Sequence, residues 1–378
     1  MINYMVSSEI IEGLFECNCI KTGAFTLRSG ELSKYYFDMK NLVSYPSLLR
    51  KIGDEIYELI KNQDANIICG VPIGGLPLCS YISVTYDIPM IMVRNEVKAY
   101  GTSKQIEGNY KSTDKCIIIE DVVTTGGSLE NVVNILKDKV NVISSVVILD
   151  RQQGHSVSVP INSLINKTDI TRYALSKIMK EKNSRLCFSA DIYDQDKLLR
   201  ILDGVGPYIV ICKIHYDCYK HNNDLKFKLI ELSVKHKFLI MEDRKFADIS
   251  YIVQRQYKQF SSWIDLVTVM GNVNSMVLSQ LSGALLVANM SNNDFDFTDK
   301  AIETSRIYPS NIIGFITQKR IYEPNMLCMT PGINIANNSV DDQKYRKVSD
   351  VDTDIIIVGR GIYLQDDYVS ACKTYSAI

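Results

Sequence analysis

The sequence predicts an α/β protein built from a parallel-sheet domain followed by a compact (β/α)8 TIM barrel. Short, nearly continuous apolar runs alternate with amphipathic stretches along most of the chain, and this alternation is typical of parallel strands that helices cover on both faces. The rhythm is more regular in the second half of the chain than in the first. A length of 378 residues also favours two domains over one.

The first half of the chain contains a set of candidate strands and helices. The apolar runs lie at 67–71, 89–93, 116–120 and 144–149, and amphipathic stretches lie at 47–61, 76–86 and 128–139. Parallel strands need crossover connections, which are usually helices. We therefore expect a domain with a mostly parallel sheet and helices packed on it.

The second half contains eight apolar runs, which lie at 186–190, 209–215, 238–241, 264–269, 284–288, 312–316, 326–329 and 354–358. Helical patterns separate most of them, for example at 194–202, 225–236 and 273–281. Eight β/α units in so short a segment indicate a compact (β/α)8 barrel. On periodicity alone, a doubly wound sheet remains the alternative.

The boundary between the two domains is expected where the polar, basic segment KIMKEKNSR leads into the first run of the barrel. The segment has neither a Pro/Gly-rich linker nor a low-complexity stretch. We therefore divide the chain into residues 1–182 and residues 183–378.

Composition and charge exclude several classes of protein. The formal net charge of -1 gives no overall basic field for binding nucleic acid or a membrane surface. The ten cysteines are scattered without the spacing of a metal site, so we expect buried free thiols in a reducing compartment. The N-terminal sequence lacks the features of a signal peptide, and no apolar stretch is long enough to span a membrane. These observations predict a cytoplasmic protein.

The strongest local motif is CIIIEDVVTTGGS at 116–128, where an apolar strand runs into two acids and then a Thr/Gly/Ser loop that opens a helix. The loop and the helix start offer backbone N–H groups for a phosphate, and glycines allow a close backbone approach. The two acids can accept hydrogen bonds from ribose hydroxyls. An ordinary strand–turn–helix with a polar turn is the alternative. The candidate residues are Glu120, Asp121, Thr124, Thr125, Gly126, Gly127 and Ser128.

This motif resembles the phosphoribosyl-pyrophosphate loop of type I phosphoribosyltransferases, and three further segments resemble the orotate branch of that family. They are FTLRSGELSKYYF at 25–37, RNEVKAYGTSKQIEG at 94–108 and LDRQQG at 149–154. The resemblance implies that orotate stacks beside an aromatic pair, that an arginine meets its carboxylate, and that cations of a closing loop neutralise pyrophosphate. It also implies Mg2+, held mainly by phosphoribosyl pyrophosphate. The residues concerned are Arg28, Tyr36, Phe37, Arg94, Lys98 and Arg151.

Three segments of the second half place charges at strand ends: SADI at 189–192, KIHYD at 213–217 and EDRKFADI at 242–249. Asp243 and Lys245 are two residues apart, so in a strand both side chains project to the same face. In a barrel, Lys213 at the end of the preceding strand can lie beside them at the catalytic mouth. The alternative is a solvated charge cluster at the start of a helix.

From about residue 186 to the end, the chain resembles the orotidine 5′-monophosphate decarboxylase family. The resemblance implies that Lys245 protonates C6 of the pyrimidine, that Asp243 lies beside the substrate carboxylate, and that Lys213 orients these charges. It implies that Asp191 holds ribose hydroxyls, that Asp248 completes the site of a partner subunit, and that no metal or organic cofactor is needed. Further substrate-binding positions that it implies are His215, Ile249, Ser291, Pro331, Gln343, Tyr345, Gly359 and Arg360.

The sequence departs from both families at several positions. Arg28 stands where the transferases usually have lysine, and Asn95 replaces a second cation of their mobile loop. In the decarboxylase-like part, Ile252 replaces a threonine, while Met270 and Asn289 stand where histidine and glutamate are usual. The four charges of the decarboxylase motif are nevertheless all present.

Together the two resemblances cover nearly the whole chain, in the order found in animal and plant uridine monophosphate synthases. They imply a bifunctional enzyme of pyrimidine biosynthesis that acts on orotate, phosphoribosyl pyrophosphate and orotidine 5′-monophosphate and forms a homodimer. A protein in which only the decarboxylase is active, or a non-catalytic protein that binds uridine monophosphate, remain alternatives. The chain is shorter than those synthases, so we expect no connecting helices between its domains.

Overall fold

The computed structural model describes residues 2–27, 29–94, 105–219, 223–290, 295–335 and 345–378. Internal contacts divide the chain into two compact units. The first comprises Met1–Lys21 and Tyr36–Ile170, and the second comprises Thr22–Tyr35 and Thr171–Ile378. Each unit is described by itself.

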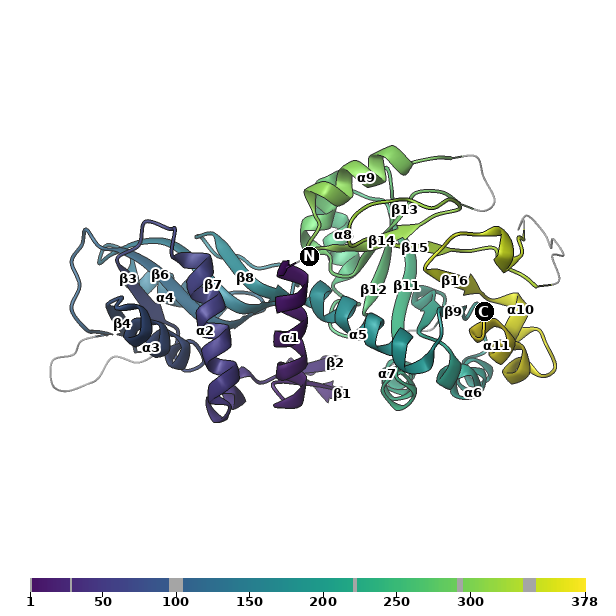
Figure 1. The fold of residues 1–378 in the computed structure, drawn as a ribbon, viewed down its shortest axis with the longest axis horizontal. Coiled ribbons are helices and arrows are strands. Elements are labelled where there is room, and N and C mark those ends of the chain that lie inside the picture. Colours follow the sequence, from purple (N-terminus) through teal and green to yellow (C-terminus); the bar gives the residue numbers. More distant parts are fainter. Residues whose placement is uncertain (1, 28, 95–104, 220–222, 291–294, 336–344) are drawn as a thin grey trace. The chain divides into compact units, whose positions relative to one another are not determined.

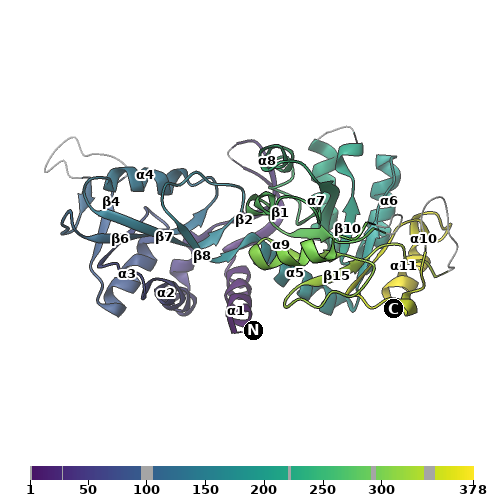
Figure 2. The same ribbon diagram turned by 90° about the horizontal axis from the view of Figure 1, so that it is seen from above.

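The first unit is a six-stranded sheet with the strand order β5-β4-β3-β6-β7-β8, in which only β5 runs antiparallel to its neighbour. Figure 2 shows α4 on one face of this sheet and α2 and α3 on the other. The predicted parallel-sheet domain is therefore confirmed. The strands are β3 (Ile67–Gly70), β4 (Met90–Val93), β5 (Ile106–Glu107), β6 (Lys115–Val123), β7 (Asn141–Asp150) and β8 (Ile161–Asn166), and the helices are α1 (Ile2–Glu16), η1 (Met39–Ser44), α2 (Pro46–Ile60), α3 (Gly75–Tyr86) and α4 (Gly127–Leu136).

The sequence analysis did not predict β5, β8 or α1. Strand β8 lies at the edge of the sheet and mixes buried with half-exposed positions, so it lacks the continuous apolar run of a central strand. Strand β5 is only two residues long. Helix α1 has no acidic residue in its first turn and no basic residue in its last turn, so it lacks charge signals at its ends.

The second unit contains a closed barrel of eight parallel strands in the order β9 to β16, with β16 pairing β9. This closure confirms the predicted barrel and excludes the doubly wound alternative. Figure 1 shows helices lying outside the ring of strands. The strands are β9 (Leu186–Ser189), β10 (Ile211–Ile214), β11 (Leu239–Phe246), β12 (Leu266–Met270), β13 (Ala284–Val287), β14 (Ile312–Ile316), β15 (Leu327–Thr330) and β16 (Ile355–Val358).

The helices of the second unit differ from the predicted eight β/α units between β12 and β13, and among the described residues no helix connects β14 with β15. An α-helix was expected at 273–281, but β12 and β13 are joined by the short 3-10 helix η4 (Ser275–Gln280). Asn274 caps it by accepting a hydrogen bond from the backbone N–H of Met276, and its buried apolar residues are Val277 and Leu278. The remaining helices are η2 (Gly206–Tyr208), η3 (Tyr216–Cys218), η5 (Val348–Asp350), α6 (Gln195–Val205), α7 (Asn223–His236), α8 (Ser250–Tyr257), α9 (Thr298–Ile307), α10 (Arg360–Tyr363) and α11 (Tyr368–Ser376).

Two segments at the edges of the predicted domains group with the barrel. Helix α5 (Lys167–Lys182) directly precedes β9, so the expectation of no connecting helix was wrong. From Thr171 onward this helix belongs to the barrel unit, as does most of the hairpin formed by β1 (Ile20–Thr26) and β2 (Leu32–Phe37). The functional division at residues 182 and 183 stays a prediction, and the compact units divide the chain differently.

All ten cysteines have free thiols, and Cys218 is the one that is exposed. The expected burial of these free thiols is confirmed for the other nine. None of the helices in the described part of the chain combines the length and the apolar character that a membrane crossing requires.

Candidate active sites

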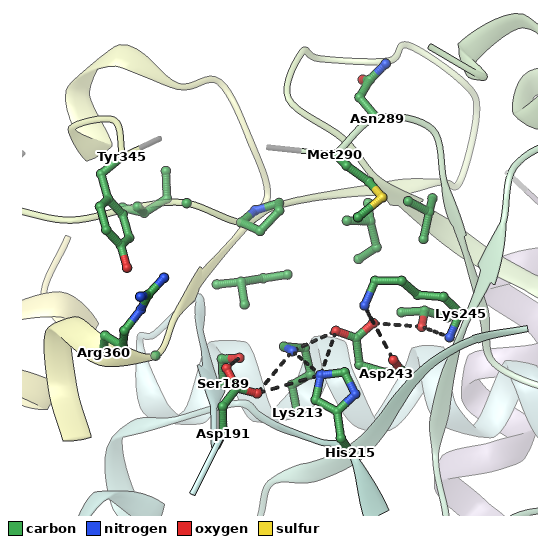
Figure 3. A pocket seen from close by; sticks show the side chains of 18 residues that line it. Ser189, Asp191, Lys213, His215, Asp243, Lys245, Asn289, Met290, Tyr345 and Arg360 are labelled. Carbon is green, nitrogen blue, oxygen red and sulfur yellow. Dashed lines mark hydrogen bonds and ion pairs between the residues drawn. The ribbon is translucent and has the colours of Figure 1, made fainter. Parts of the chain in front are cut away.

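A cavity of about 250 Å³ opens at the carboxyl ends of the barrel strands. Side chains from the ends of β9 to β16, or from the loops that follow them, line it, as is usual for the mouth of such a barrel. Figure 3 shows the charged groups gathered in this cavity. Its lining consists of Ser189, Asp191, Lys213, His215, Asp243, Lys245, Thr268, Val287, Asn289, Met290, Ile316, Pro331, Gly332, Ile333, Tyr345, Ile357, Gly359 and Arg360.

A carboxylate between two ammonium groups forms the centre of the cavity. Asp243 Oδ2 accepts a hydrogen bond from Lys213 Nζ at 2.7 Å, and Asp243 Oδ1 lies 3.0 Å from Lys245 Nζ. Thr268 Oγ1 donates to Asp243 Oδ1 at 2.8 Å. The Lys213 and Asp243 side chains are each 10% exposed, so the charges are fixed in a site with little solvent.

The local course of β11 turns Lys245 toward Asp243. The pairing of β11 with β12 shifts register between Glu242 and Phe246, and Lys245 has a positive φ of 53°. The backbone N–H of Lys245 donates to Thr268 Oγ1 at 3.0 Å. A bulge and a left-handed residue are costly local features that often occur where a functional side chain must be aimed.

The charges in this cluster change the pKa values of its members. Burial acts to raise the pKa of Asp243, but Lys213 and Lys245 outweigh it and hold that pKa well below its usual range. Burial acts to lower the pKa of Lys213, but Asp243 and Asp191 raise it. Burial and the positive charge of Lys213 lower the pKa of His215. At neutral pH, the centre therefore holds ionised Asp243 and Lys213 beside a neutral imidazole.

One side of the charged centre presents groups suited to hydroxyls. Asp191 Oδ1 lies 3.7 Å from Lys213 Nζ and 3.7 Å from His215 Nε2, and Ser189 Oγ donates to Asp191 Oδ2 at 2.9 Å. The Asp191 side chain is 44% exposed, so its remaining lone pairs face the opening.

Across the cavity from this centre lies a cationic edge, as Figure 3 shows. Gly359 and Arg360 follow β16, and the Arg360 guanidinium lies 5.8 Å from the ring centroid of Tyr345. The carboxyl end of the last strand is a common phosphate site in barrels. Pro331 and Ile333 also line the cavity, so it offers apolar surface besides the charged centre and the anion-binding edge.

The structure brings together nine of the decarboxylase positions singled out from the sequence and leaves two described positions apart. Asp248 and Ile249 are exposed and do not line this cavity. Ser291 and Gln343 lie outside the described residues. The nine in the lining are Asp191, Lys213, His215, Asp243, Lys245, Pro331, Tyr345, Gly359 and Arg360.

Sequence reasoning missed Thr268 and Ser189. Thr268 Oγ1 donates to Asp243 and accepts from the backbone N–H of Lys245. In the sequence, the feature that could have identified Thr268 is that it is a polar residue inside the apolar run of β12. Asn289 was noted only as a departure, yet its Oδ1 accepts from Thr317 Oγ1 at 2.9 Å and so ties the β13 loop to the β14 loop.

In the first unit, Glu120 and Asp121 lie next to each other within β6, and their side chains interact with each other. Burial and the neighbouring Asp121 raise the pKa of Glu120 to about 9. A methyl group added at Gly74 would lie 2.0 Å from Asp121 Oδ2, and one added at Gly75 would lie 2.1 Å from the carbonyl oxygen of Ile119. The two glycines therefore let the 71–75 loop lie directly against the acids.

The Thr/Gly/Ser loop leads from β6 into α4 as the sequence predicts. Gly126 precedes the helix with φ of 81°, and Gly127 is its first residue, with open space where a side chain would stand. Thr125, Gly127 and Ser128 are exposed, and Thr124 is half-buried. The helix start thus presents backbone N–H groups to solvent beside the two acids.

The proposed orotate-binding residues partly meet in the first unit. The Arg151 guanidinium lies 5.2 Å from the ring centroid of Phe37, and its Nη1 lies 3.5 Å from Thr124 Oγ1. Tyr36 is 42% exposed. Arg94 pairs with Glu107 at 2.7 Å. The predicted positions Arg28 and Lys98 lie outside the described residues, as does Asn95.

One group of side chains in the described residues has the spacing of metal ligands. His215, Asp217 and Glu242 bring ligand atoms within 4.8 Å of one another. Asp217 is paired with Arg244, and Glu242 Oε2 accepts from the backbone N–H of Tyr216 at 2.8 Å. Protein partners therefore explain the positions of the Asp217 and Glu242 carboxylates, and no metal ion is needed to explain them.

Comparison with known proteins gives matches to both halves. The family "Orotidine 5'-phosphate decarboxylase / HUMPS family" matches residues 184–375, and "Phosphoribosyl transferase domain" matches residues 38–168. The uridine 5′-monophosphate synthase of Bos taurus is 31% identical over 97% of this chain and 95% of its own length. The uridine 5′-monophosphate synthase of Naegleria gruberi is 29% identical over 98% of this chain and 95% of its own length. A solved structure of Leishmania donovani UMP synthase has a TM-score of 0.40 and 28% identity, covering 47% of this chain and 39% of that one.

Proposed function

The chain belongs to the uridine 5′-monophosphate synthase family, and from that membership we propose which of its side chains carry each reaction. It joins orotate to phosphoribosyl pyrophosphate and then decarboxylates the orotidine 5′-monophosphate that forms. Both reactions act on small molecules. The assignment of residues to steps, the metal and the assembly are our proposals.

For decarboxylation, we propose that the pyrimidine ring of the substrate lies in the cavity with C6 next to Lys245. Loss of CO2 leaves an electron pair on C6. The Lys245 ammonium, held 3.0 Å from Asp243 Oδ1, stabilises that charge and then donates a proton to C6. Because Asp243 is ionised, it faces the substrate carboxylate with like charge, and this repulsion is relieved as CO2 leaves.

Three groups would fix the rest of this substrate. Asp191 and Lys213 lie where ribose hydroxyls can bond to them, 3.7 Å apart on one side of the charged centre. Arg360, with the loop backbone at Gly359, would hold the 5′-phosphate at the opposite edge. Binding energy from this remote phosphate can be used to press the carboxylate toward Asp243. We propose that no cofactor takes part.

For the transferase, we propose that the start of α4 holds the 5′-phosphate of phosphoribosyl pyrophosphate and that Glu120 and Asp121 accept from its ribose hydroxyls. Arg151, whose guanidinium is planar, suits the orotate carboxylate. Phe37, 5.2 Å from it, would stack beside the base. Arg94 and Lys98 would neutralise the pyrophosphate that leaves.

A magnesium ion fits the transferase site by the chemistry of its donors. The half-buried carboxylate of Asp121 and the half-buried hydroxyl of Thr124 are hard oxygen groups beside the anion-binding loop. We propose that phosphoribosyl pyrophosphate holds most of the ion's ligand positions and that Asp121 orients the hydroxyls that complete them. When bound, magnesium supplies positive charge to the pyrophosphate as it departs.

We also propose a homodimer in which Asp248 reaches the decarboxylase site of the partner subunit. Asp248 carries a charge of the decarboxylase motif yet is exposed and outside the cavity of its own chain. A neighbouring subunit is the place where such a side chain could complete a site. A cytoplasmic location stays a prediction.

The observation that carries the proposal is the Lys213–Asp243–Lys245 charge arrangement inside a cavity with a cationic far edge. The test assays the two reactions separately in the full chain. Orotidine 5′-monophosphate alone reports the decarboxylase. Orotate with phosphoribosyl pyrophosphate, supplied to a Lys245→Ala variant, reports the transferase because the intermediate accumulates. An active Lys245→Ala decarboxylase would refute the assignment.

A further inference from the structure

A buried ion pair ties the hairpin of the N-terminal half to the barrel. Lys34 Nζ donates to Asp265 Oδ2 at 2.5 Å, and Tyr35 Oη donates to Asp265 Oδ1 at 2.8 Å. The Lys34 and Asp265 side chains are 4% and 0% exposed. The backbone N–H of Ile240 also donates to Asp265 Oδ2, at 2.7 Å. Each carboxylate oxygen is thus satisfied, and losing either Lys34 or Asp265 would leave the other charge unpaired in the interior.

The attachment continues along the hairpin. The backbone N–H of Lys34 donates to the carbonyl of Ser262 at 3.1 Å, and Ser33 Oγ donates to the same carbonyl at 3.0 Å. Ser262 Oγ in turn donates to Glu31 Oε1 at 2.7 Å. Leu32 packs against the hydrophobic core of the barrel. The segment 31–35 is therefore held by hydrogen bonds, charge and apolar contact together.

This attachment lies at the end of the barrel away from the decarboxylase cavity. Asp265 directly precedes β12, and Phe238, whose carbonyl accepts from Lys34 Nζ at 3.4 Å, directly precedes β11. The cavity opens at the opposite, carboxyl ends of these strands. The Lys34–Asp265 pair therefore has no direct part in decarboxylation, because the active sites of such barrels lie at the carboxyl ends of the strands.

Strand β2 carries the attachment toward the transferase residues. It runs without a break from Leu32 to Phe37. Its residues through Tyr35 group with the barrel, and Tyr36 and Phe37 group with the first unit. Phe37 then lies 5.2 Å from the Arg151 guanidinium. The residue locked by Asp265 is thus joined, through one extended peptide, to the pair proposed to stack beside orotate.

We propose that Asp265 of the barrel is a positioning residue for the transferase reaction, fixing β2 through Lys34 and Tyr35 so that Tyr36 and Phe37 are held in place for orotate. The proposal rests on the orotate site assigned above. According to this proposal, the barrel supports the transferase reaction in addition to catalysing decarboxylation. A loosened strand lets the aromatic pair move, and small displacements of groups that position a substrate are costly to its binding and turnover.

The experiment measures both reactions in full-length Tyr35→Phe, which removes one hydroxyl and keeps the Lys34–Asp265 pair. The KM for orotate should rise by about three- to tenfold, because only part of the free energy of a hydrogen bond to a charged group is transmitted to the orotate site. Decarboxylation of orotidine 5′-monophosphate should keep its kcat and KM. Lys34→Met should raise the KM for orotate further, and Lys34→Arg, which keeps the cation, should restore most of the loss.

Tyr257→Phe is the matched control. Tyr257 is also a buried tyrosine, and its hydroxyl bonds Ser282 Oγ at 2.7 Å instead of the hairpin. It should leave the KM for orotate unchanged. The proposal is overturned if Tyr35→Phe leaves that KM unchanged, or if Tyr35→Phe lowers thermal stability and both activities in parallel, which is the signature of a purely structural contact.

Failure of the orotate site itself would look different. Arg151→Met should raise the KM for orotate if the assigned site is right. If Arg151→Met has no effect while Tyr35→Phe raises the KM, the barrel still positions the transferase but the site is assigned to the wrong residues. Arg151→Met therefore tests the orotate site, and Tyr35→Phe tests the positioning role of the barrel.

Discussion

Lys213 Nζ lies 2.7 Å from Asp243 Oδ2 at the mouth of the barrel, and each side chain is only 10% exposed. Thr268 Oγ1 also donates to Asp243, so hydrogen bonds hold the pair in a site with little solvent and the charges need little rearrangement when substrate binds. A third charge, Lys245, lies on the other oxygen of the same carboxylate at 3.0 Å. The decarboxylase centre is thus a preorganised array with one ammonium placed to meet the reacting carbon.

Lys245→Ala should abolish decarboxylation and leave the transferase intact. The change removes both the stabilising charge and the proton donor, so kcat should fall by at least about 10⁴-fold. The measurement is steady-state turnover of orotidine 5′-monophosphate, with orotate consumption measured in the same preparation. Loss of both activities in a folded variant would contradict independent sites.

Thr268→Val should slow decarboxylation by about tenfold or more, because it removes a hydrogen bond to the Asp243 carboxylate and the acceptor for the Lys245 backbone. The matched control is Thr304→Val. Thr304 is equally buried, and its hydroxyl has no hydrogen-bond partner among the described residues. Comparable kinetic losses in both variants would show that Thr268 matters only for packing.

Gly74→Ala should impair the transferase selectively. The added methyl would lie 2.0 Å from Asp121 Oδ2, so either the loop or the carboxylate must move. We expect a loss of about tenfold to a hundredfold in transferase kcat/KM, as for other small displacements in a site. Decarboxylase activity is the internal control. Wild-type transferase kinetics in this variant would show that Asp121 need not hold its present position.

Glu242→Gln should flatten the dependence of stability on pH. Burial raises the pKa of Glu242 to about 8, whereas an unfolded glutamate titrates near about 4.3. Between these values the folded state binds more protons, so this residue's contribution to stability falls as pH rises. The Gln variant should gain up to about 5 kcal/mol relative to the parent at pH about 8, at about 1.4 kcal/mol for each pH unit between the two pKa values, and lose that gain near about pH 4.

Denaturant unfolding of both proteins at several pH values measures this difference. The amide can still accept from the backbone N–H of Tyr216, so that contact is preserved. A difference in unfolding free energy that does not vary with pH would show that Glu242 keeps an ordinary pKa.

Asp248→Asn should lower decarboxylation although Asp248 is outside the cavity of its own chain. If each subunit completes its partner's site, mixing Asp248→Asn with Lys245→Ala should regenerate one intact site in each mixed dimer. Activity of the mixture should therefore exceed that of either variant alone. No recovery on mixing, with dimers shown to exchange by sedimentation or light scattering, would rule out the shared site.

Much of the fold follows from local sequence because buried parallel strands need long apolar runs. All eight barrel strands were located from such runs, and the Asp243/Lys245 spacing placed both side chains on the cavity face. The edge strand β8 escaped prediction because only part of it is buried. The helix expected at 273–281 is a 3-10 helix, since apolar spacing does not distinguish a full helix from a shorter turn.

The features that sequence could not provide depend on contacts between distant segments. Thr268 acquires its role only because β12 lies beside β11. The Lys34–Asp265 ion pair joins residues 231 positions apart, and nothing near either residue signals the other. The register shift that aims Lys245 is likewise a property of strand pairing, which local sequence does not reveal.

One incubation tests the central claim most directly. The purified full chain is given orotate, phosphoribosyl pyrophosphate and magnesium, and the nucleotides are resolved by chromatography over time. The account predicts transient orotidine 5′-monophosphate followed by uridine 5′-monophosphate. Orotidine 5′-monophosphate that accumulates without decarboxylation, or the absence of both nucleotides from a folded protein, would contradict it.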